Sequence, residues 1–585
     1  MIDSRQDRIM QNLQVDLHQG ACIMEHAYSG GHISKIVLGE NTCVPIQKND
    51  IVVFVGPNNA GKSQALRDIY HLCHQKTNPI VVKDLWVSKS PCPLSQTLSL
   101  LSDGLNLGNR TRYSILNENY SIYEHSDRDY RKNQYHGEFY SAFVANLDTA
   151  ARLTICLPPN SISRDGQKSH PIHYAAFDGS KRKWLSSNFK KAFGIDLIPN
   201  TQFGATIPLC LGEPVQLSGK YADEQERQEA YAAILSKYKK VHDQGDGIKS
   251  FVGILLYLMM DHFCTYLIDE PESFLHPPQA HIMGQIIGQT LSENQQAFIS
   301  THSEDIIKGL LAVCPERLKI VRITRKDDIN CFSILENKTF SDIWSDPLLK
   351  YSNIMSSLFH KSVVLCESDS DCKMYAAVES HIKASIGKYS ETLFVHCGGK
   401  HRMSKIITAL RSLNIPIILI PDIDVLNDES IFMGITQAFG LSWDDLQKDY
   451  RIIASNLHSS KEKIARTEAR ATILSIIDSK AEKELSSAEI NAIKSSVKIS
   501  SKWDNLKASG VASLPAGDAT AAFNRLDRIL RDNGVYLVPV GELECFIKEI
   551  GGHGPEWVNK VFEKYPDMNN DVYSGILKFI AQMNL

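Results

Sequence analysis

Residues 56–63 have the types and the spacing of a phosphate-binding loop. They read Gly-Pro-Asn-Asn-Ala-Gly-Lys-Ser, which fits GxxxxGK[ST], and they stand between the apolar run Ile51–Val55 and a helical pattern. Glycines let backbone N–H groups wrap a phosphate, and the helix N-terminus adds the positive end of a dipole. This strand–loop–helix context predicts a nucleotide site.

We assign the contacts within this loop by residue type. Lys62 is expected to neutralise charge on the β- and γ-phosphates, and Ser63 to ligate Mg²⁺. The loop at Asn58, Asn59 and Gly61 is expected to cradle the phosphates. The cofactors predicted for this site are therefore ATP and Mg²⁺.

Two later segments offer the remaining groups of a nucleotide hydrolase. In Tyr266–Glu272, apolar residues lead into Asp269, placed to hold Mg²⁺ through water, and Glu270, placed to orient the attacking water. One predicted strand later, His302 stands just past a strand end, within reach of a γ-phosphate. Alone, such a histidine is more often structural, but the order and spacing of these segments favour a switch histidine.

A second chemistry is indicated by acids that follow two other apolar runs. Glu367 comes directly after one run, with Asp371 four residues on, and Asp422 and Asp424 follow the other. Ligands of an open parallel sheet lie beyond the carboxyl ends of its strands, and residues two apart in extended backbone share a face. Clustered carboxylates repel one another and need hard cations, and metal pairs about 4 Å apart serve phosphodiester hydrolysis. We therefore predict a site for Mg²⁺, with Mn²⁺ or Ca²⁺ as alternatives.

Both sites depend on alternating strands and helices, which is typical of parallel α/β sheets. In the first part we expect strands at 265–268, 297–300 and 317–323 and helices at 248–261 and 281–291. The pattern restarts near residue 355, with strands at 363–366, 393–396, 415–420 and 535–540 and helices at 372–382 and 403–413. This predicts two α/β domains, 1–355 and 356–585. An insertion is expected within about 80–245, and an exposed helical one at about 456–510, where Lys, Glu, Ser and Ala dominate.

Composition narrows the class of protein. The 585 residues carry a net charge of −4, which excludes a histone-like polycation but not a local basic surface for nucleic acid. The 13 cysteines form no CxxC pair, which disfavours a disulfide framework or a zinc ribbon and favours a reducing, cytoplasmic setting. The longest apolar run, Phe251–Met260, is too short for a membrane span, which needs about 20 residues.

The nucleotide motifs resemble those of ABC-type ATPases, in the branch that contains RecF and SMC heads. In that family a signature loop opens the helix before the acidic strand, and Gly245–Ser250 has about the right spacing here, although it departs from LSGGQ. The resemblance implies ATP held between two chains, and hence a homodimer or homotetramer. The insertion within 80–245 is then a probable dimerisation element.

The acidic motifs of the second domain look like those of a TOPRIM domain. The resemblance rests on residues 364–371, 397–400 and 420–424, with Ser368 in place of the usual glycine. It implies one ion on Glu367 and Asp371 and another on Asp422 and Asp424, helped by Glu544 or, as the alternative, Glu542. It also implies a C-terminal lysine that stabilises the transition state, and the spacing does not choose among Lys548, Lys560, Lys564 and Lys578. Lys400 and Arg402, at a predicted helix start, are candidate contacts to a DNA backbone.

An ABC-type head followed by TOPRIM is similar to the OLD (overcoming lysogenization defect) nuclease family, which includes the Gabija nuclease subunit and some retron effectors. The resemblance implies an ATP-regulated, metal-dependent endonuclease on DNA, of prokaryotic or phage source, in antiphage defence. It leaves room for a helicase or a retron RNA–DNA as partner. Two alternatives stay open: a DNA-sensing ATPase with a silent TOPRIM unit, and the same nuclease acting on RNA such as tRNA. A topoisomerase is disfavoured, because little chain remains for a tyrosine-bearing DNA gate.

Overall fold

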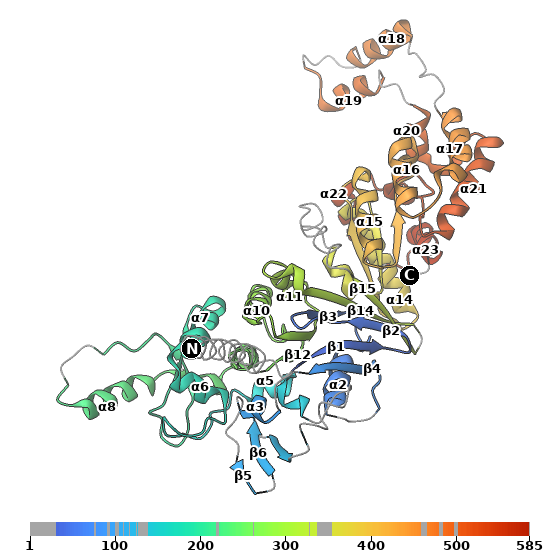
Figure 1. The fold of residues 1–585 in the computed structure, drawn as a ribbon. Helices are drawn as coiled ribbons and strands as arrows, with labels where there is room; N and C mark the ends of the chain where they lie inside the picture. The colour runs from blue at the N-terminus through green and yellow to red at the C-terminus, as the bar shows by residue number, and fades with distance from the viewer. Residues whose placement is uncertain are drawn as a thin grey trace, which may run out of the picture. The chain divides into compact units, whose positions relative to one another are not determined.

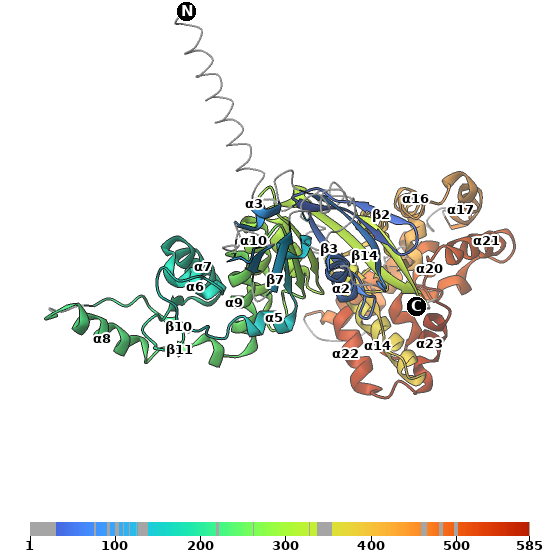
Figure 2. The same ribbon diagram turned by 60° about the horizontal axis from the view of Figure 1, so that its bottom comes forward.

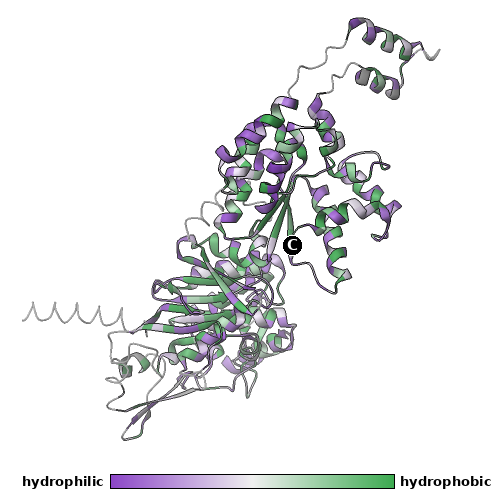
Figure 3. Cartoon of the chain, turned by 90° about the vertical axis from the view of Figure 1, so that its right-hand side faces the viewer, coloured by the Kyte–Doolittle hydropathy of each residue, from purple (hydrophilic) through white to green (hydrophobic). Residues whose placement is uncertain are grey.

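A computed structural model describes most of the chain. The described residues are 31–74, 78–89, 94–99, 105–108, 110–115, 118–123, 126, 139–217, 221–260, 263–326, 328–335, 354–457, 465–478, 484–496 and 501–583. The chain divides into two compact units, residues 1–346 and 347–585, and each has its own hydrophobic core (Figure 1). In Figure 3 the central strands of each unit are coloured mainly as hydrophobic.

The first unit is built on a six-stranded sheet in the order β15-β14-β3-β13-β12-β8. Its strands are β3 (Ile51–Val55), β8 (Val144–Leu147), β12 (Thr265–Asp269), β13 (Gln296–Ser300), β14 (Leu318–Lys326) and β15 (Ile329–Leu335). Neighbours run parallel except β14 and β15, which form an antiparallel pair. Every residue of β3 and β13 is buried, which explains why the sequence shows unbroken apolar runs there.

One face of this sheet shares a hydrophobic core with helix α2 (Lys62–Cys73) and with a small antiparallel sheet. That sheet has the order β2-β1-β4, from β1 (Gly31–Leu38), β2 (Thr42–Pro45) and β4 (Val82–Lys89). Figure 2 shows α2 beside β3. The predicted helices of this unit are confirmed as α9 (Asp246–Leu258) and α10 (Pro277–Thr290), followed by α11 (Glu304–Leu311).

The segment between β8 and α9 adds helices and a small sheet. It contains α5 (Thr149–Thr154), α6 (Pro171–Phe177), α7 (Gly179–Phe193), β9 (Asp196–Pro199), β10 (Leu209–Gly212), α8 (Glu224–Leu235) and β11 (Lys239–Lys240). Helices α5, α6 and α7 pack against α9. The three strands pair antiparallel in the order β11-β10-β9. A further antiparallel sheet has the order β5-β6-β7, from β5 (Leu105–Asn106), β6 (Arg110–Ile115) and β7 (Glu118–Tyr123). A dimerisation role for the insertion stays a prediction.

The second unit is built on a parallel sheet in the order β17-β16-β18, with β16 (Ser362–Cys366), β17 (Thr392–His396) and β18 (Ile417–Ile420). Its helices include α14 (Asp369–Ser385), α15 (Met403–Ser412), α16 (Glu429–Ala438), α17 (Trp443–Leu457), α21 (Asp518–Asp532), α22 (Gly554–Lys564) and α23 (Ser574–Ala581). The strand predicted at 535–540 is wrong in extent. Residues 535–538 run beside β18 with a single bridge from Val535 to Leu419, and Pro539 has no N–H to continue a ladder.

The polar stretch at 456–510 is helical in the parts that the structure describes. Helices α18 (Arg466–Ile477) and α19 (Ser487–Ser496) lie largely exposed, as predicted. Helix α20 (Lys502–Ser509) differs from the prediction, because Trp503 and Leu506 are buried and make it part of the core. Among all the helices of the described ranges, none is long and apolar enough to cross a membrane.

Candidate nucleotide and metal sites

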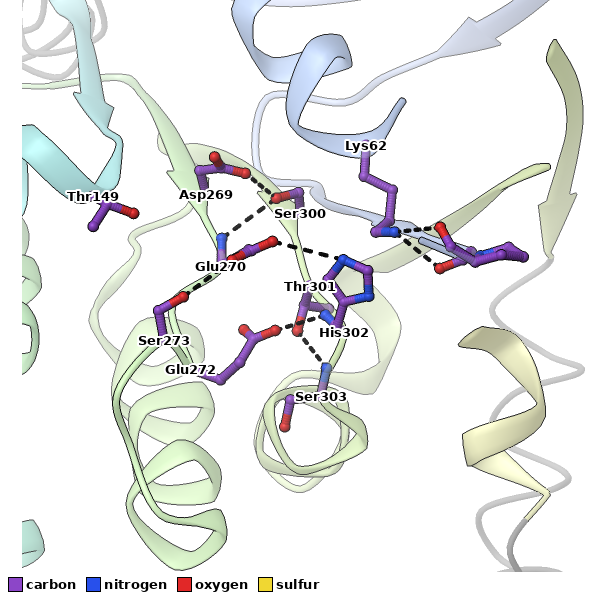
Figure 4. Close-up of polar contacts among 12 residues, drawn as sticks. Lys62, Thr149, Asp269, Glu270, Glu272, Ser273, Ser300, Thr301, His302 and Ser303 are labelled. Atoms are coloured by element: carbon purple, nitrogen blue, oxygen red, sulfur yellow. Dashed lines mark hydrogen bonds and ion pairs between the residues drawn. The ribbon is translucent and has the colours of Figure 1, made fainter. Parts of the chain in front are cut away.

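The phosphate-binding loop joins β3 to α2, and its backbone is fixed by the neighbouring strand. Gly56 has a φ of 142°, and a Cβ there would collide with the carbonyl oxygen of Ile323 on β14. Only glycine fits this approach. Asn58 and Asn59 are exposed on the loop, Gly61 caps α2, and Ser63 lies in its first turn. The Nζ of Lys62 donates to the carbonyl oxygens of Gly56 and Pro57, at 2.9 and 2.7 Å (Figure 4).

The carboxyl ends of β12 and β13 bring the predicted acidic and histidine residues together. Asp269 pairs in register with Ser300, whose hydroxyl donates to the Asp269 carboxylate. The backbone N–H of Glu270 donates to the Ser300 carbonyl oxygen at 2.9 Å, and Glu270 adopts a left-handed φ of 47°. His302 Nε2 lies 3.6 Å from Glu270 Oε1 (Figure 4).

Two charged residues that the sequence reasoning did not assign complete this end of the sheet. Glu272 is half-buried and accepts the backbone N–H of His302 at 2.6 Å. Arg152, on α5, has no exposed surface and donates from its guanidinium to the Glu270 carbonyl oxygen at 3.1 Å. Glu272 stands inside a quoted motif, but Arg152 has no motif around it, so only the fold reveals it.

The stretch Gly245–Ser250, expected as a signature loop, forms the start of α9. Gly245 caps the helix, and Lys249 Nζ pairs with Asp246 at 2.8 Å. A Cβ at Gly247 would lie 2.6 Å from the Phe274 carbonyl oxygen, so this glycine already has a packing reason within one chain. A contact to ATP on another chain stays a prediction.

Burial sets the electrostatics of the nucleotide site. It lowers the pKa of Lys62 to about 8, although Glu270, Glu272 and Asp269 oppose the shift. Burial also lowers the pKa of His302, and the Lys62 charge adds to that effect. A bound phosphate would favour the protonated, charged form of Lys62 and so offset the cost of desolvating it.

In the second unit, the carboxylates of Glu367, Asp422 and Asp424 converge, with one oxygen of each within 4.8 Å of the others. Glu367 follows β16 and Asp422 follows β18, which are neighbours in the sheet. The sequence predicted that these carboxylates converge, but it placed Asp422 and Asp424 in extended backbone, which is wrong for Asp424. Asp424 lies in a 3-10 turn, Ile423–Asn427, rather than in extended backbone.

Asp371 stands apart from this group of three. Its carboxylate accepts the Ser368 N–H at 2.8 Å in a capping box that begins α14, and Ser368 caps in return. The serine in place of the family's usual glycine therefore has a structural role. Burial raises the pKa of Asp371, with Glu544 and Glu542 adding to the rise, and Asp371 in turn raises the pKa of Asp422 and of Glu367. Its pairing with Glu367 on one ion stays a prediction.

Two lysines face the carboxylates. Lys400 Nζ lies 3.3 Å from Asp424 Oδ2, and Lys507 Nζ lies 3.7 Å from the same oxygen and 3.3 Å from Glu542 Oε2. Lys507 lies on α20, and the backbone at Lys507 packs against the backbone at Gly541. Gly541 has a φ of 115°, and a Cβ there would collide with the Lys507 carbonyl oxygen.

The four C-terminal lysines are placed differently. Lys560 pairs with Glu556 at 2.8 Å on its own helix, Lys564 lies over the Tyr565 ring, and Lys578 is exposed. No ion pair joins any of the four, Lys548 included, to the clustered acids among the described residues. Sequence reasoning missed Lys507, because it lies in a polar segment read as an exposed insertion.

The acids of this group fit a hard cation. Glu367 Oε2 and Asp424 Oδ1 are buried and have no hydrogen-bond partner among the described atoms. Burial raises the pKa of Asp422 well above its usual range, and Asp371, Glu367 and Asp424 raise it further. Burial, followed by Asp424, also raises the pKa of Glu367. Orphaned carboxylate oxygens that repel one another are the ligands that Mg²⁺ or Mn²⁺ would satisfy.

Comparison with known families gives two matches. Residues 51–307 match AAA_21, described as an AAA domain of the AbiEii-toxin, type IV toxin–antitoxin kind. Residues 358–424 match the overcoming lysogenization defect protein-like TOPRIM domain. The chain therefore joins an AAA-type ATPase domain to an OLD-like TOPRIM domain, and this combination matches an OLD-family fusion. The nucleotide loop and the three converging acids lie within these matches.

The chain also has structural neighbours among solved ATPase heads. An SMC head bound to the C-winged helix domain of ScpA is 12% identical, with a TM-score of 0.32, over 53% of this chain and 100% of that one. The SMC head domain from Thermotoga maritima is 13% identical, with a TM-score of 0.27, over 52% of this chain and 99% of that one. No curated protein matches the chain significantly.

The low pKa of Lys62 predicts proton uptake when nucleotide binds. At pH 8 about half of the Lys62 side chains are neutral, and phosphate charge should protonate them. Calorimetry of MgATP binding in buffers of different ionisation enthalpy should show uptake near pH 8 and little at pH 6.5. Lys62→Arg, which stays protonated, should abolish the difference. Equal uptake in both proteins would contradict the assignment.

The raised carboxylate pKa values predict how pH acts on the metal-free protein. Asp422 has a higher pKa in the folded protein than in the unfolded chain, where it lies near 4. Its contribution to the free energy of unfolding is therefore lost as pH rises from about 4 through the folded pKa. Denaturation in EDTA should therefore show less stability at pH 7.5 than at pH 5.5, and Asp422→Asn should reduce that loss. The exposed Asp532→Asn should leave it unchanged, and an Asp422→Asn profile equal to wild type would refute the cause.

Proposed function

We propose that this OLD-family protein is an ATP-regulated, divalent-metal-dependent endonuclease that cleaves DNA. The observation that carries the proposal is the convergence of Glu367, Asp422 and Asp424 beside Lys400 and Lys507. Three acids suit cations, and two lysines next to them suit a phosphodiester anion. The family match adds the nuclease type, and the intact nucleotide motifs add ATP.

The proposed mechanism divides the work among the chain's own groups. Glu367, Asp422 and Asp424 would hold a divalent ion, with Asp371 and Glu544 near a second position. Such ions supply an activated water and stabilise the leaving oxygen. Lys507 is close enough to the acids to contact a non-bridging oxygen of the scissile phosphate. Asp424 and Glu542 orient its ammonium group, and together with Asp422 they raise the Lys507 pKa, although burial alone would lower it.

Lys400 would contact the DNA backbone rather than the reacting phosphate. Its Nζ also donates to the Asp424 carbonyl oxygen at 3.3 Å, so two contacts hold it at the rim of the acids. Arg402 is exposed three residues after Gly399 and stays a candidate backbone contact. Contacts of this kind position a substrate without reading its sequence, which fits the absence of any base-reading motif in the sequence.

In the ATPase unit, Asp269 would hold Mg²⁺ through water, Glu270 would orient the attacking water, and His302 would sense the γ-phosphate. Lys62, Ser63 and the backbone of Asn58, Asn59 and Gly61 would bind the phosphates. We propose that the chain works as a homodimer or homotetramer in antiphage defence, on the strength of its OLD-family membership, with a helicase or a retron RNA–DNA as possible partner types.

The central prediction concerns cleavage. With Mg²⁺ or Mn²⁺ and ATP, wild type should nick or linearise plasmid DNA, and Asp422→Asn should lose about 100-fold or more of that rate. Asp532→Asn is the matched control. Lys62→Ala should still cut but no longer respond to ATP. If wild type and Asp422→Asn leave DNA equally intact, the TOPRIM unit has no nuclease activity. If only RNA is cut, the proposed DNA substrate is wrong.

A separate prediction assigns the lysine. Lys507→Met should lower kcat by about 10²–10³-fold, the usual effect of removing one preorganised donor to a transition-state oxygen. Binding of Mn²⁺ to the acids should be kept or tightened, because a competing cation is gone. Lys507→Arg should restore part of kcat. A loss confined to Lys560→Met or Lys578→Met would return the role to the C-terminal lysines.

A further inference from the structure

Among the described residues, Tyr375 carries a buried hydroxyl group without a hydrogen-bond partner. Tyr375 lies on α14, and its side chain is 1% exposed. The ring packs in the core of the second unit, with its centroid 6.3 Å from that of Phe579. Buried hydroxyl groups are nearly always hydrogen-bonded, because an unpaired one keeps the full cost of leaving water. Packing alone therefore does not explain why a tyrosine rather than a phenylalanine stands here.

The charges that act on this hydroxyl group belong to the candidate metal site. Burial raises the pKa of Tyr375 well above its usual range, and the negative charges of Asp371 and then of Asp422 raise it further. Asp371 precedes Tyr375 by four residues, which places both side chains on one face of α14. Because the effect of a charge falls with distance, the hydroxyl group lies near these two carboxylates.

The sheet places Asp422 on the same side as Tyr375. Ile420, the last residue of β18, packs in the same core cluster as Tyr375. Residues two apart in extended backbone share a face, and Asp422, with φ −60° and ψ 150°, continues that alternation just beyond the strand. The Asp422 carboxylate therefore lies between the core, from which Tyr375 comes, and the two acids Glu367 and Asp424 with which it converges.

Of the two carboxylates near Tyr375, that of Asp422 is the better acceptor for its hydroxyl group. The Asp371 carboxylate already accepts the Ser368 N–H at 2.8 Å in the capping box of α14. Asp422 faces mainly acids, which raise its pKa beyond the effect of burial, and Lys507 opposes them. A carboxylate that holds a cation is ionised, and a hydrogen bond to an ionised acceptor is roughly twice as strong as one between neutral groups.

We propose that Tyr375 is a positioning residue, whose hydroxyl group donates a hydrogen bond to the Asp422 carboxylate when a divalent cation is bound and so fixes how Asp422 holds that ion. The inference rests on the proposed metal-dependent function and adds to it a residue outside the ligand set. Removal of a donor that orients a metal ligand typically weakens metal binding by about 10–100-fold. In this role Tyr375 touches neither the ion nor the DNA, so its effect belongs to metal affinity and not to the stability of the metal-free chain.

Tyr375→Phe tests the proposal in the full-length chain, with Tyr573→Phe as the matched control. Both tyrosines are buried in the same core, but the Tyr573 hydroxyl group donates to the Tyr565 carbonyl oxygen at 2.7 Å. Calorimetric titration of Mn²⁺ without nucleotide should show at least about tenfold weaker binding for Tyr375→Phe and unchanged binding for Tyr573→Phe. Urea denaturation in EDTA should show the reverse, with an unchanged or higher midpoint for Tyr375→Phe and a lower one for Tyr573→Phe.

Equal Mn²⁺ affinity of wild type and Tyr375→Phe would overturn the inference and leave the proposed function standing. A midpoint in EDTA as low for Tyr375→Phe as for Tyr573→Phe would also overturn it, because the hydroxyl group would then have a structural partner in the metal-free chain. A wild type that binds no Mn²⁺ would overturn both the inference and the metal dependence. If Tyr375→Phe weakens Mn²⁺ binding as expected and wild type leaves DNA intact, the inference stands and the proposed nuclease activity fails.

Discussion

Mutual repulsion among carboxylates is the constraint on which the second unit depends. Glu367, Asp422 and Asp424 meet where two parallel strands end, and burial together with like charge makes their ionised forms costly. Positive charge has to offset that cost. Lys400 and Lys507 supply part of it. Lys507 lies on α20, which is packed into the core through Trp503 and Leu506, and Gly541 approaches the Lys507 carbonyl oxygen closely. A bound cation would supply the rest.

In the first unit, hydrogen bonds to the neighbouring strand and to a buried arginine hold the acidic residues in place. Asp269 and Glu270 stand at the end of β12, and Ser300 on β13 holds both of them through its hydroxyl and its carbonyl oxygen. Glu270 adopts a left-handed conformation, which costs a non-glycine residue about 1–3 kcal/mol. The buried guanidinium of Arg152 holds the Glu270 carbonyl oxygen and helps to maintain that conformation. The side chain proposed to orient water is thus positioned by the fold before any nucleotide arrives.

In both units the candidate site lies at the carboxyl ends of neighbouring parallel strands, although one sheet has six strands and the other three. Parallel strands bring residues that are far apart in the sequence to the same sheet edge, as β12 and β13 do for Asp269 and Ser300 and as β16 and β18 do for Glu367 and Asp422. Contiguous motifs such as residues 56–63 were therefore readable, and so were the acids that directly follow apolar runs. Where the sequence reasoning erred, it had only composition to use: α20 looked like an exposed polar helix, yet Trp503 and Leu506 bury one of its faces.

The sequence by itself determined the two α/β units, the phosphate-binding loop and the acids at strand ends, because each depends on residues that are neighbours along the chain. Only the tertiary structure decided which charges meet. Lys507 lies more than 80 residues from Asp424 in the sequence, and Arg152 lies more than 100 residues from Glu270. His553 lies beside Glu544 only because the loop between them folds back. Long-range electrostatic partners leave no local pattern, because attraction between charges depends on distance in space and not on spacing along the chain.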